Sequence, residues 1–577
     1  MGGFNVCFTL SMKFYKRFVF ILKDNYILLA LLVIGGFFRF YKLDWGSGYF
    51  FHPDERNVIS LAMSLSVNNL IKGTFAYGSL TAFFAFLADS FRINVLHGTN
   101  ANSFEFTGIL LRMVSAVFSC ATIITAYFFV KRFFNKKAAL ISVFFIAFAP
   151  GLIQAAHFLT FESLLTFLYL LNLYWLYCFF QIKKLKFFFF SLLTLAFASA
   201  LKINSALLLL PGLAGLAWVA HKKYNPLKLL IIFLGGMILF ILVTLLFSPY
   251  YLSRDFINML VYEKGVVSGS LDVFYTRQFI GARPVVYQIF RVLPYIFSPF
   301  AILTLIVVIV MGFSFLLRKI FSETVLGLFS RLSRKAGLAF LGTFLYWLIL
   351  FLPNAFLFSK WSRYMIPPLP YLLIMMALFI DKIKDKLIFK GVVLFTSFLW
   401  TLAFMSVYFQ PDVRITASKW IFQNIKDKSY ILSETANVVD IPLYTDEIRS
   451  NKSYTIKNFD FYNLDFNPKL TDELVDWLAK ADYIFIPSNR LFAGMGKNKE
   501  KYPLLFNYYQ LLFSGKLGFE EIKKFDSFPQ LLGFKINDEG AEGTWTVFDH
   551  PVIRIYAKTM IYSKEGYLHM LSVNKME

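Results

Sequence analysis

The stretch LLIIFLGGMILFILVTLLF, residues 229–247, decides the fold class, because it is apolar except for Thr244 and carries no charged side chain. A helix needs about 20 such residues to cross the hydrocarbon core of a bilayer. Lys222, Lys223 and Lys228 lie on one side of the stretch, and a long link of about residues 249–287 follows on the other. The sequence therefore predicts a membrane-spanning helix with one basic end.

Further apolar stretches of this kind fill the chain as far as residue 410. The predicted spans are residues 26–41, 107–130, 138–152, 161–180, 187–201, 203–220, 228–248, 288–316, 336–354, 364–380 and 390–409. The chain of 577 residues is 58% hydrophobic and 16% charged, whereas soluble proteins have about 25% charged residues. We therefore expect an α-helical polytopic membrane protein with about eleven transmembrane helices in residues 1–410.

The net charge of +23 is explained by membrane topology rather than by nucleic-acid binding. The whole excess lies in residues 1–410, where 23 of the 37 Lys and Arg residues occur in short basic links that alternate with other links. Basic links between spans stay on the cytoplasmic side. We therefore expect a multi-pass protein of the cell (plasma) membrane with a cytoplasmic amino terminus. The long links of residues 42–105 and 249–287 and the carboxyl-terminal residues 411–577 would face outward.

Residues 411–577 have the composition of a soluble protein. Helical patterns at residues 414–425 and 471–480 alternate with strand patterns at residues 430–434 and 483–486, which is typical of a small α/β domain. These residues include no cysteine, so disulfides do not hold the domain together. We expect an extracytoplasmic α/β domain in which Glu434, Asp549 and His550 have structural roles.

Asp54 and Glu55 follow the first predicted span, in a link that is long enough to be functional. One interpretation is that Asp54 caps a surface helix and that the helix dipole favours Glu55. The other is catalytic, because a carboxylate at the membrane boundary is partly desolvated, and partial desolvation can raise the pKa of an acid as a general base requires. Both interpretations remain open from the residues alone.

His157 and Glu162 form a second polar spot, between the third and fourth predicted spans. Thr160 would cap the fourth helix and place Glu162 in its first turn. An acid at the apolar boundary is costly, however, and such acids are usually functional. His157 and Glu162 are also possible ligands for a divalent cation, but one histidine with scattered acids is a weak metal signal. No metal or other cofactor is expected, and a divalent cation remains an alternative.

Several cations are predicted on the same outer side. They are Arg39, Arg112, Lys202, Arg283, Lys360 and Arg363. Snorkelling or ion pairing is the ordinary explanation for each. If Arg363, Lys202, Arg283, Lys360 and Arg112 met in one cavity, they would bind a phosphate. A lipid phosphate leaves without protonation, whereas an attacking hydroxyl needs a base. The residues therefore suit sugar transfer from a lipid phosphate to a hydroxyl.

The chain resembles the GT-C superfamily, in particular the protein O-mannosyltransferase and lipid A aminoarabinose transferase group of phospholipid-carrier-dependent glycosyltransferases. The resemblance covers most of residues 26–410 and rests on five stretches in the family's order. They are Phe38-Arg39-Phe40-Tyr41 with Asp54-Glu55, Tyr77-Gly78-Ser79-Leu80, Leu111-Arg112-Met113-Val114-Ser115 as far as Ala149-Pro150, His157 with Glu162, and Arg363-Tyr364-Met365-Ile366-Pro367.

The resemblance implies that Asp54 is the catalytic base and Glu55 its acidic neighbour. It implies that Glu162, with His157, provides a second acid at a position where the family commonly has Asp, and that Arg363 lies near the carrier phosphate. It further implies surface helices in the first outer link, a polyprenyl-phosphate sugar donor and an inverting single displacement. The sugar, hexose or pentose, and the acceptor, a protein, glycan or lipid, remain open.

The main alternative is a transporter or flippase of lipid-linked saccharides. Transporters commonly contain internal repeats and bind their substrate near the middle of the membrane. The second half of this sequence does not repeat the first, and the candidate acids of the chain cluster at the outer surface rather than in the middle of the membrane. A receptor whose outer domain binds a ligand is a third hypothesis, but it leaves the long acidic first link unexplained.

Overall fold

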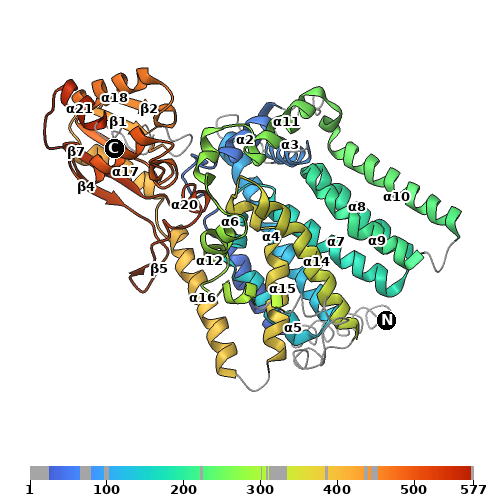
Figure 1. Cartoon of the computed structure of the whole chain (residues 1–577). Coiled ribbons are helices and arrows are strands. Elements are labelled where there is room, and N and C mark those ends of the chain that lie inside the picture. Colours follow the sequence, from blue (N-terminus) through green and yellow to red (C-terminus); the bar gives the residue numbers. More distant parts are fainter. Residues whose placement is uncertain are drawn as a thin grey trace, which may run out of the picture.

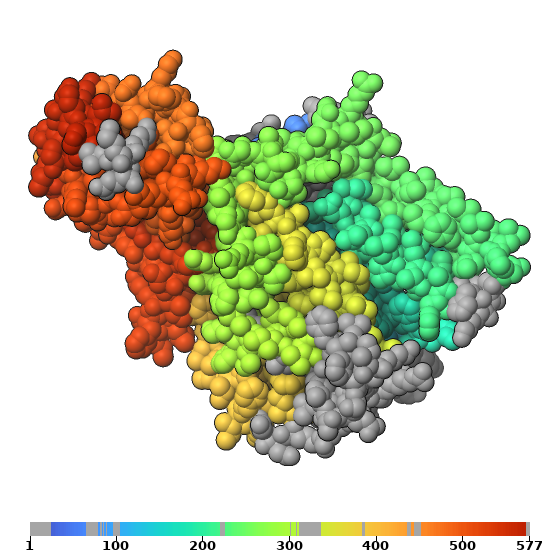
Figure 2. All heavy atoms as spheres, in the orientation of Figure 1, coloured from blue at the N-terminus to red at the C-terminus, as the bar shows by residue number. Residues whose placement is uncertain are grey.

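The structure is a computed structural model that describes most of the chain. The described residues are 25–64, 79–95, 103–220, 225–300, 302–306, 309–310, 334–383, 387–434, 440–443 and 452–572. They form a helical part up to residue 409 and, beyond it, a smaller domain of helices and strands (Figure 1). Figure 2 shows this domain, coloured orange to red, resting against the green and yellow segments of the helical part.

Among the described residues, five helices are long and apolar enough to cross a membrane. They are α4 (Ser103–Phe133), α7 (Glu162–Ile182), α10 (Pro226–Phe247), α14 (Arg334–Phe356) and α16 (Leu387–Phe409). α5 (Lys136–Ala147) and α6 (Pro150–His157) meet at a bend of 53° and make a sixth if they form one broken span. Shorter apolar helices are Asn25–Phe40, α8 (Leu185–Leu201) and Ile203–Val219, which combines η2 (Ile203–Leu208) with α9 (Leu209–Ala220).

Helices therefore lie at every span predicted between residues 26 and 248, although several are shorter than a bilayer is thick. The span predicted at 288–316 begins with the short helices η5 (Gln288–Val292) and α12 (Leu293–Ile296), and its end lies outside the described residues. The span predicted at 364–380 is α15 (Leu369–Lys382), which begins directly after two prolines. The chain is a polytopic α-helical protein in which fewer helices than the predicted eleven reach full membrane length.

The bend between α5 and α6 is held by Arg39, which is fully buried. The last carbonyls of a helix have no partner within it, and the Arg39 guanidinium donates hydrogen bonds to those of Ile146 and Ala147 at 2.9 and 2.8 Å. Arg39 is thus an internal contact rather than a snorkelling side chain. Gly151 follows the bend, and a Cβ there would lie 2.6 Å from the Cβ of Ile296. Only glycine allows α6 to approach α12 so closely.

Helices also occupy the two long links. The first link contains α2 (Pro53–Ser64) and α3 (Ser79–Asn94), and the second contains η3 (Pro249–Leu252), α11 (Arg254–Ser268) and η4 (Phe274–Phe279). In α2 the apolar side chains of Val58, Ile59 and Leu61 are buried, so this helix is packed into the protein on one face. Tyr77 and Gly78, which contribute to the family resemblance, lie outside the described residues.

The carboxyl-terminal domain contains a five-stranded sheet in the order β2-β1-β3-β7-β4. The strands are β1 (Tyr430–Glu434), β2 (Thr455–Phe459), β3 (Tyr483–Ile486), β4 (Phe519–Phe525) and β7 (Ile553–Lys558). β1 pairs in parallel with β2 and β3, whereas β7 is antiparallel to β3 and β4. The main helices are α17 (Val413–Asn424), α18 (Pro468–Lys480), α19 (Pro503–Phe513) and α21 (Lys564–Ser572). Both strands predicted from the sequence are present, in a mixed α/β domain.

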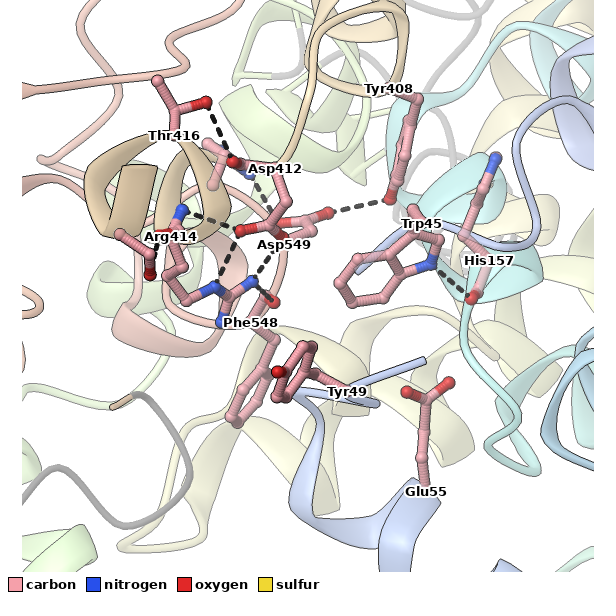
Figure 3. A network of polar contacts seen from close by, with 12 residues as sticks. Trp45, Tyr49, Glu55, His157, Tyr408, Asp412, Arg414, Thr416, Phe548 and Asp549 are labelled. Carbon is pink, nitrogen blue, oxygen red and sulfur yellow. Dashed lines mark hydrogen bonds and ion pairs between the residues drawn. The ribbon is translucent and has the colours of Figure 1, made fainter. Parts of the chain in front are cut away.

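A buried polar network joins this domain to the helical part (Figure 3). The carboxylate of Asp549 accepts hydrogen bonds from Tyr408 in α16 at 2.8 Å and from Gln154 in α6 at 2.9 Å. His550 lies between Asp549 and Asp538, and both of its ring nitrogens contact a carboxylate. Unpaired charges at this depth would be costly, so the network fixes the position of the domain. Asp549 thus connects the two parts of the chain, and His550 pairs with it from within the carboxyl-terminal domain.

Candidate functional site

A cavity of about 710 Å³ lies between the helical part and the carboxyl-terminal domain. This volume is in the range of small-molecule sites. Its charged lining residues are Asp54, Glu162, Lys202, Glu263, Lys264, Arg363 and Arg490. They come from α2, α7, the end of α8, α11, the segment before α15 and the carboxyl-terminal domain. Acids and cations from distant parts of the sequence therefore share one cavity.

Asp54 lies in the first turn of α2 and faces this cavity. Its carboxylate forms an ion pair with the guanidinium of Arg363, and the side chains of Asp54 and Arg363 are 20% and 28% exposed. The helix begins at Pro53, and the ring of His52 accepts a hydrogen bond from the Asp54 N–H at 3.2 Å. Asp54 is thus inside the helix rather than its cap, and its side chain lines the cavity.

Glu55 points away from the cavity and is fully buried. Both of its oxygens bind the guanidinium of Arg112, at 2.8 and 2.7 Å, and one also accepts the N–H of Leu159 at 3.0 Å. Arg112 further donates to the carbonyls of Leu43 and Trp45, at 2.8 and 3.0 Å. This bidentate pair ties α2 to α4 and to the loop before α7. Glu55 and Arg112 are therefore structural anchors, and neither is among the residues that line the cavity.

Of the cations predicted to bind phosphate, Arg363 and Lys202 line the cavity. Arg363 lies in the short helix η7 (Ser362–Met365). Lys202 follows the last residue of α8, and its Nζ lies 4.9 Å from the centre of the Tyr364 ring. Lys202 is close enough to Glu162 and Asp54 for their charges to interact, and Arg363 forms an ion pair with Asp54. Together they form a compact patch of positive charge beside two carboxylates.

Two other predicted cations lie elsewhere in the described part of the chain. Arg283 is exposed, and Lys360 is buried with its ammonium donating to the carbonyl of Leu357. Neither belongs to the cavity lining. Their positions do not support the predicted role in phosphate binding.

Glu162 is the first residue of α7, as predicted, and it is buried at the cavity wall. Its Oε2 has no hydrogen-bond partner among the described residues, so the carboxylate is available to a ligand. Thr160 does not cap α7, because the structure places Phe161 at that position.

His157 is separate from this group. Its ring stacks on Tyr408, with ring centres 3.9 Å apart, and its nitrogens lie 2.9 Å from the carbonyls of Ile153 and Tyr41. It is not a cavity residue in the described structure. Among the described residues there is no group of three or more His, Cys, Asp or Glu suited to a metal ion.

The sequence analysis missed Glu263 and Lys264 of α11 and Arg490 and Thr544 of the carboxyl-terminal domain. Glu263 is half-buried, and burial raises its pKa, whereas the charges of Arg363 and Lys202 lower it. The unusual length of the link at residues 249–287 could have indicated that a residue in it, such as Glu263, contributes to the site. Nothing in the local sequence around Arg490 or Thr544 indicates that they meet residues of the helical part.

The carboxyl-terminal domain also holds the segment that carries Arg363. The fully buried Glu542 precedes the short helix α20 (Gly543–Thr546) and accepts the N–H of Ser362 at 2.8 Å. The hydroxyls of Ser362 and Thr544 lie 3.1 Å apart. Burial raises the pKa of Glu542, and the hydrogen bonds that it accepts lower it. Arg363 is therefore positioned by contacts from both parts of the chain.

Part of the chain is similar to a known protein family. Residues 101–249 match the family described as dolichyl-phosphate-mannose-protein mannosyltransferase. The predicted resemblance to this group is confirmed. The matched stretch begins at α4 and ends just after α10, so it contains Arg112, His157, Glu162 and Lys202. None of the curated proteins compared with the chain matches it.

The chain is also similar to solved structures. ArnT from Cupriavidus metallidurans bound to undecaprenyl phosphate is 11% identical, with a TM-score of 0.43, over 92% of this chain and 97% of that chain. The Archaeoglobus fulgidus oligosaccharyltransferase in its apo form is 12% identical, with a TM-score of 0.44, over 89% of this chain and 76% of that chain.

Proposed function

We propose that this protein is a membrane glycosyltransferase that moves a sugar from polyprenyl phosphate to a hydroxyl group of a protein, glycan or lipid. The observation that carries the proposal is the ion pair of Asp54 and Arg363 inside the cavity. It places a carboxylate base next to a cation suited to phosphate. The match of residues 101–249 to a family of mannosyltransferases supports it.

In the proposed reaction, Arg363 and Lys202 bind the phosphate of the donor and stabilise the charge that it gains as it leaves. A new bond forms between the acceptor oxygen and the anomeric carbon, while the bond from that carbon to the phosphate oxygen breaks. Asp54 takes the proton of the acceptor hydroxyl. Attack from the side opposite the phosphate inverts the anomeric centre in a single displacement.

The donor phosphate and Asp54 compete for Arg363 in this scheme. Binding of the phosphate draws the guanidinium away from the carboxylate, and a carboxylate without its cation is a stronger base. Glu162 and Glu263 are then placed to orient the sugar or acceptor hydroxyls. Charge neutralisation by Lys202 and Arg363 makes a divalent cation unnecessary for this mechanism.

The proposed location is the cell membrane, with a cytoplasmic amino terminus and the carboxyl-terminal domain outside. The basic links that alternate along residues 1–410 support this orientation. The transferred unit is a hexose or a pentose, and the cavity faces the same side of the membrane as the carboxyl-terminal domain, where acceptor glycans and proteins would meet it.

The proposal is tested with the purified full chain in detergent, radiolabelled polyprenyl-phosphate hexose and pentose, and a panel of hydroxyl acceptors. We expect the unchanged protein to transfer sugar, and we expect the transfer rate of Asp54→Asn to be lower by about 10²–10⁴-fold. Asp44→Asn is the matched control, because Asp44 is 56% exposed and paired only at the surface with Lys42. If Asp54→Asn transferred sugar at the normal rate, Asp54 would not be the general base.

The transporter alternative gives a different result. A flippase moves lipid-linked saccharide across proteoliposomes but does not turn the donor over in detergent, where no bilayer separates two sides. Lipid movement without turnover would therefore favour transport over glycosyl transfer.

A further inference from the structure

A small hairpin in the carboxyl-terminal domain ends in apolar side chains. β5 (Gln530–Leu531) and β6 (Phe534–Lys535) pair in antiparallel fashion. Leu532 and Gly533 form the turn with φ values of 50° and 85°. Two-residue turns with positive φ at both positions favour Asn or Asp followed by Gly. A leucine in the left-handed region is unusual, so its presence at this tip needs an explanation other than turn chemistry.

The tip is strongly exposed in the isolated chain. Leu532 is 91% exposed and Phe534 is 79% exposed, and Ile536 directly beyond the hairpin is 38% exposed. Exposed hairpin tips in water are normally polar. A contiguous exposed apolar group of this kind indicates a contact surface.

The hairpin lies beside a membrane-spanning helix. The N–H of Gln530 donates to the hydroxyl of Ser406 in α16 at 2.9 Å. Figure 1 shows the hairpin projecting from the carboxyl-terminal domain alongside the adjoining end of α16. Ser406 is three residues before Phe409, the end of the helix, which is roughly 5 Å along the helix axis. The hairpin tip therefore lies at the level of the membrane boundary.

The length of α16 also places the hairpin tip near the membrane boundary. Its 23 residues extend roughly 34 Å as a helix, slightly more than the hydrocarbon core of about 30 Å. Only a short portion of α16 therefore protrudes above the apolar layer on the side of the carboxyl-terminal domain. Phe409, at this end, is itself 48% exposed, as is common for aromatic residues at the membrane interface.

We infer that the β5–β6 hairpin inserts Leu532 and Phe534 into the bilayer leaflet next to the carboxyl-terminal domain. Lipid acyl chains then cover the exposed apolar side chains, and no protein partner is needed. Lys535 follows Phe534 and pairs with Asp526 at 2.6 Å. An amine at this position can reach the lipid phosphates while its stem remains in the apolar layer. The hairpin gives the domain a second attachment to the membrane besides α16, and this inference does not depend on the proposed enzymatic function.

The inference is tested by spin labelling of Leu532→Cys in the full chain, reconstituted in lipid nanodiscs. Accessibility to oxygen, which concentrates in the bilayer, is compared with accessibility to a water-soluble nickel chelate. Ile561→Cys is the matched control, because Ile561 is 87% exposed and lies between β7 and α21, which Figure 1 places on the side of the domain away from α16. The unsubstituted chain corrects for labelling of Cys7, Cys120 and Cys178.

We expect a severalfold higher ratio of oxygen to nickel accessibility at position 532 than at 561. Phe534→Cys gives an independent second reading. Equal nickel accessibility at 532, 534 and 561 would show that the hairpin stays in water and overturn the inference. Protection of 532 and 534 from both reagents would also overturn it, since another protein surface, such as a second copy, would then cover the tip.

Discussion

Asp54 and Arg363 form an ion pair across the cavity although 309 positions separate them in the sequence. One is the proposed base, and the other is the proposed ligand of the donor phosphate. In the absence of donor, each satisfies the charge of the other. In the proposed mechanism the same contact links phosphate binding to the basicity of the carboxylate, and the two roles can be separated by substitution.

Arg363→Gln removes the guanidinium and should lower the transfer rate by about 10²–10³-fold, with weaker donor binding. Arg363→Lys should lose less, because it keeps the charge but not the bidentate geometry. Steady-state kinetics with varied donor measure both effects. Arg283→Gln is the control, since Arg283 is an exposed arginine outside the cavity lining. Unchanged donor saturation in Arg363→Gln would contradict the assignment.

Glu55→Gln should destabilise the protein by about 3–5 kcal/mol, because the buried Arg112 loses its charged partner. Thermal unfolding in detergent measures this change. Asp54→Asn should unfold close to the unchanged protein, since the partly exposed Arg363 can be solvated. If Glu55→Gln unfolded at the normal temperature and lost only activity, Glu55 would be a catalytic residue rather than an anchor.

Glu542→Gln should weaken donor binding, because one amide oxygen cannot replace both carboxylate oxygens that hold Ser362 and Thr544. We expect a loss of about 1–2 kcal/mol, or roughly tenfold in donor KM. Glu434→Gln is the matched control. Glu434 is also buried and accepts a hydrogen bond from Tyr509, but within the carboxyl-terminal domain.

The two variants separate positioning from simple loss of stability. Burial raises the pKa of both carboxyl groups, to about 8 for Glu434. Both substitutions should therefore alter thermal unfolding, but only Glu542→Gln should change donor KM. A similar increase of KM in both variants would mean that general destabilisation, not the position of Arg363, is responsible.

The contact between the two parts of the chain should weaken at high pH. Burial alone would lower the pKa of His550, but the charges of Asp549 and Asp538 raise it to about 10, compared with about 6.5 in an unfolded chain. The charged histidine thus contributes stability that is fully present below about pH 6.5 and is lost as pH rises through about 10. Limited proteolysis between residues 410 and 550 across this range measures the loss, which His550→Gln should largely remove. A pH response of the same size in His550→Gln would reject the role of this group.

The sequence predicted elements and side-chain types better than their contacts. Apolar runs indicated the helices up to residue 248, because each run determines its own secondary structure. Asp54, Glu162 and Arg363 were selected as candidates because acids and cations at a membrane boundary are suited to a base and a phosphate ligand. Glu55 was grouped with Asp54, but consecutive residues on a helix point in different directions, so only one of them faces the cavity.

The contribution of the carboxyl-terminal domain was outside the reach of the sequence. The bond from Ser362 to Glu542 connects residues 180 positions apart, and no local pattern marks either residue as a partner of the other. Arg112 was missed as an anchor for a similar reason. Its guanidinium is suited both to phosphate and to a buried carboxylate, and only the fold decides between them.

The position of Thr544 and Phe548 in the cavity wall has a consequence for the synthesis and folding of the protein. A ribosome delivers the helices of residues 1–410 to the membrane before it makes these two residues. The newly inserted helices therefore enclose only part of the cavity, which stays open on the side where the last domain will dock. Under the proposed function, a nascent chain that stops between these points would be anchored in the bilayer without activity, and sugar transfer would begin only once the whole protein is folded.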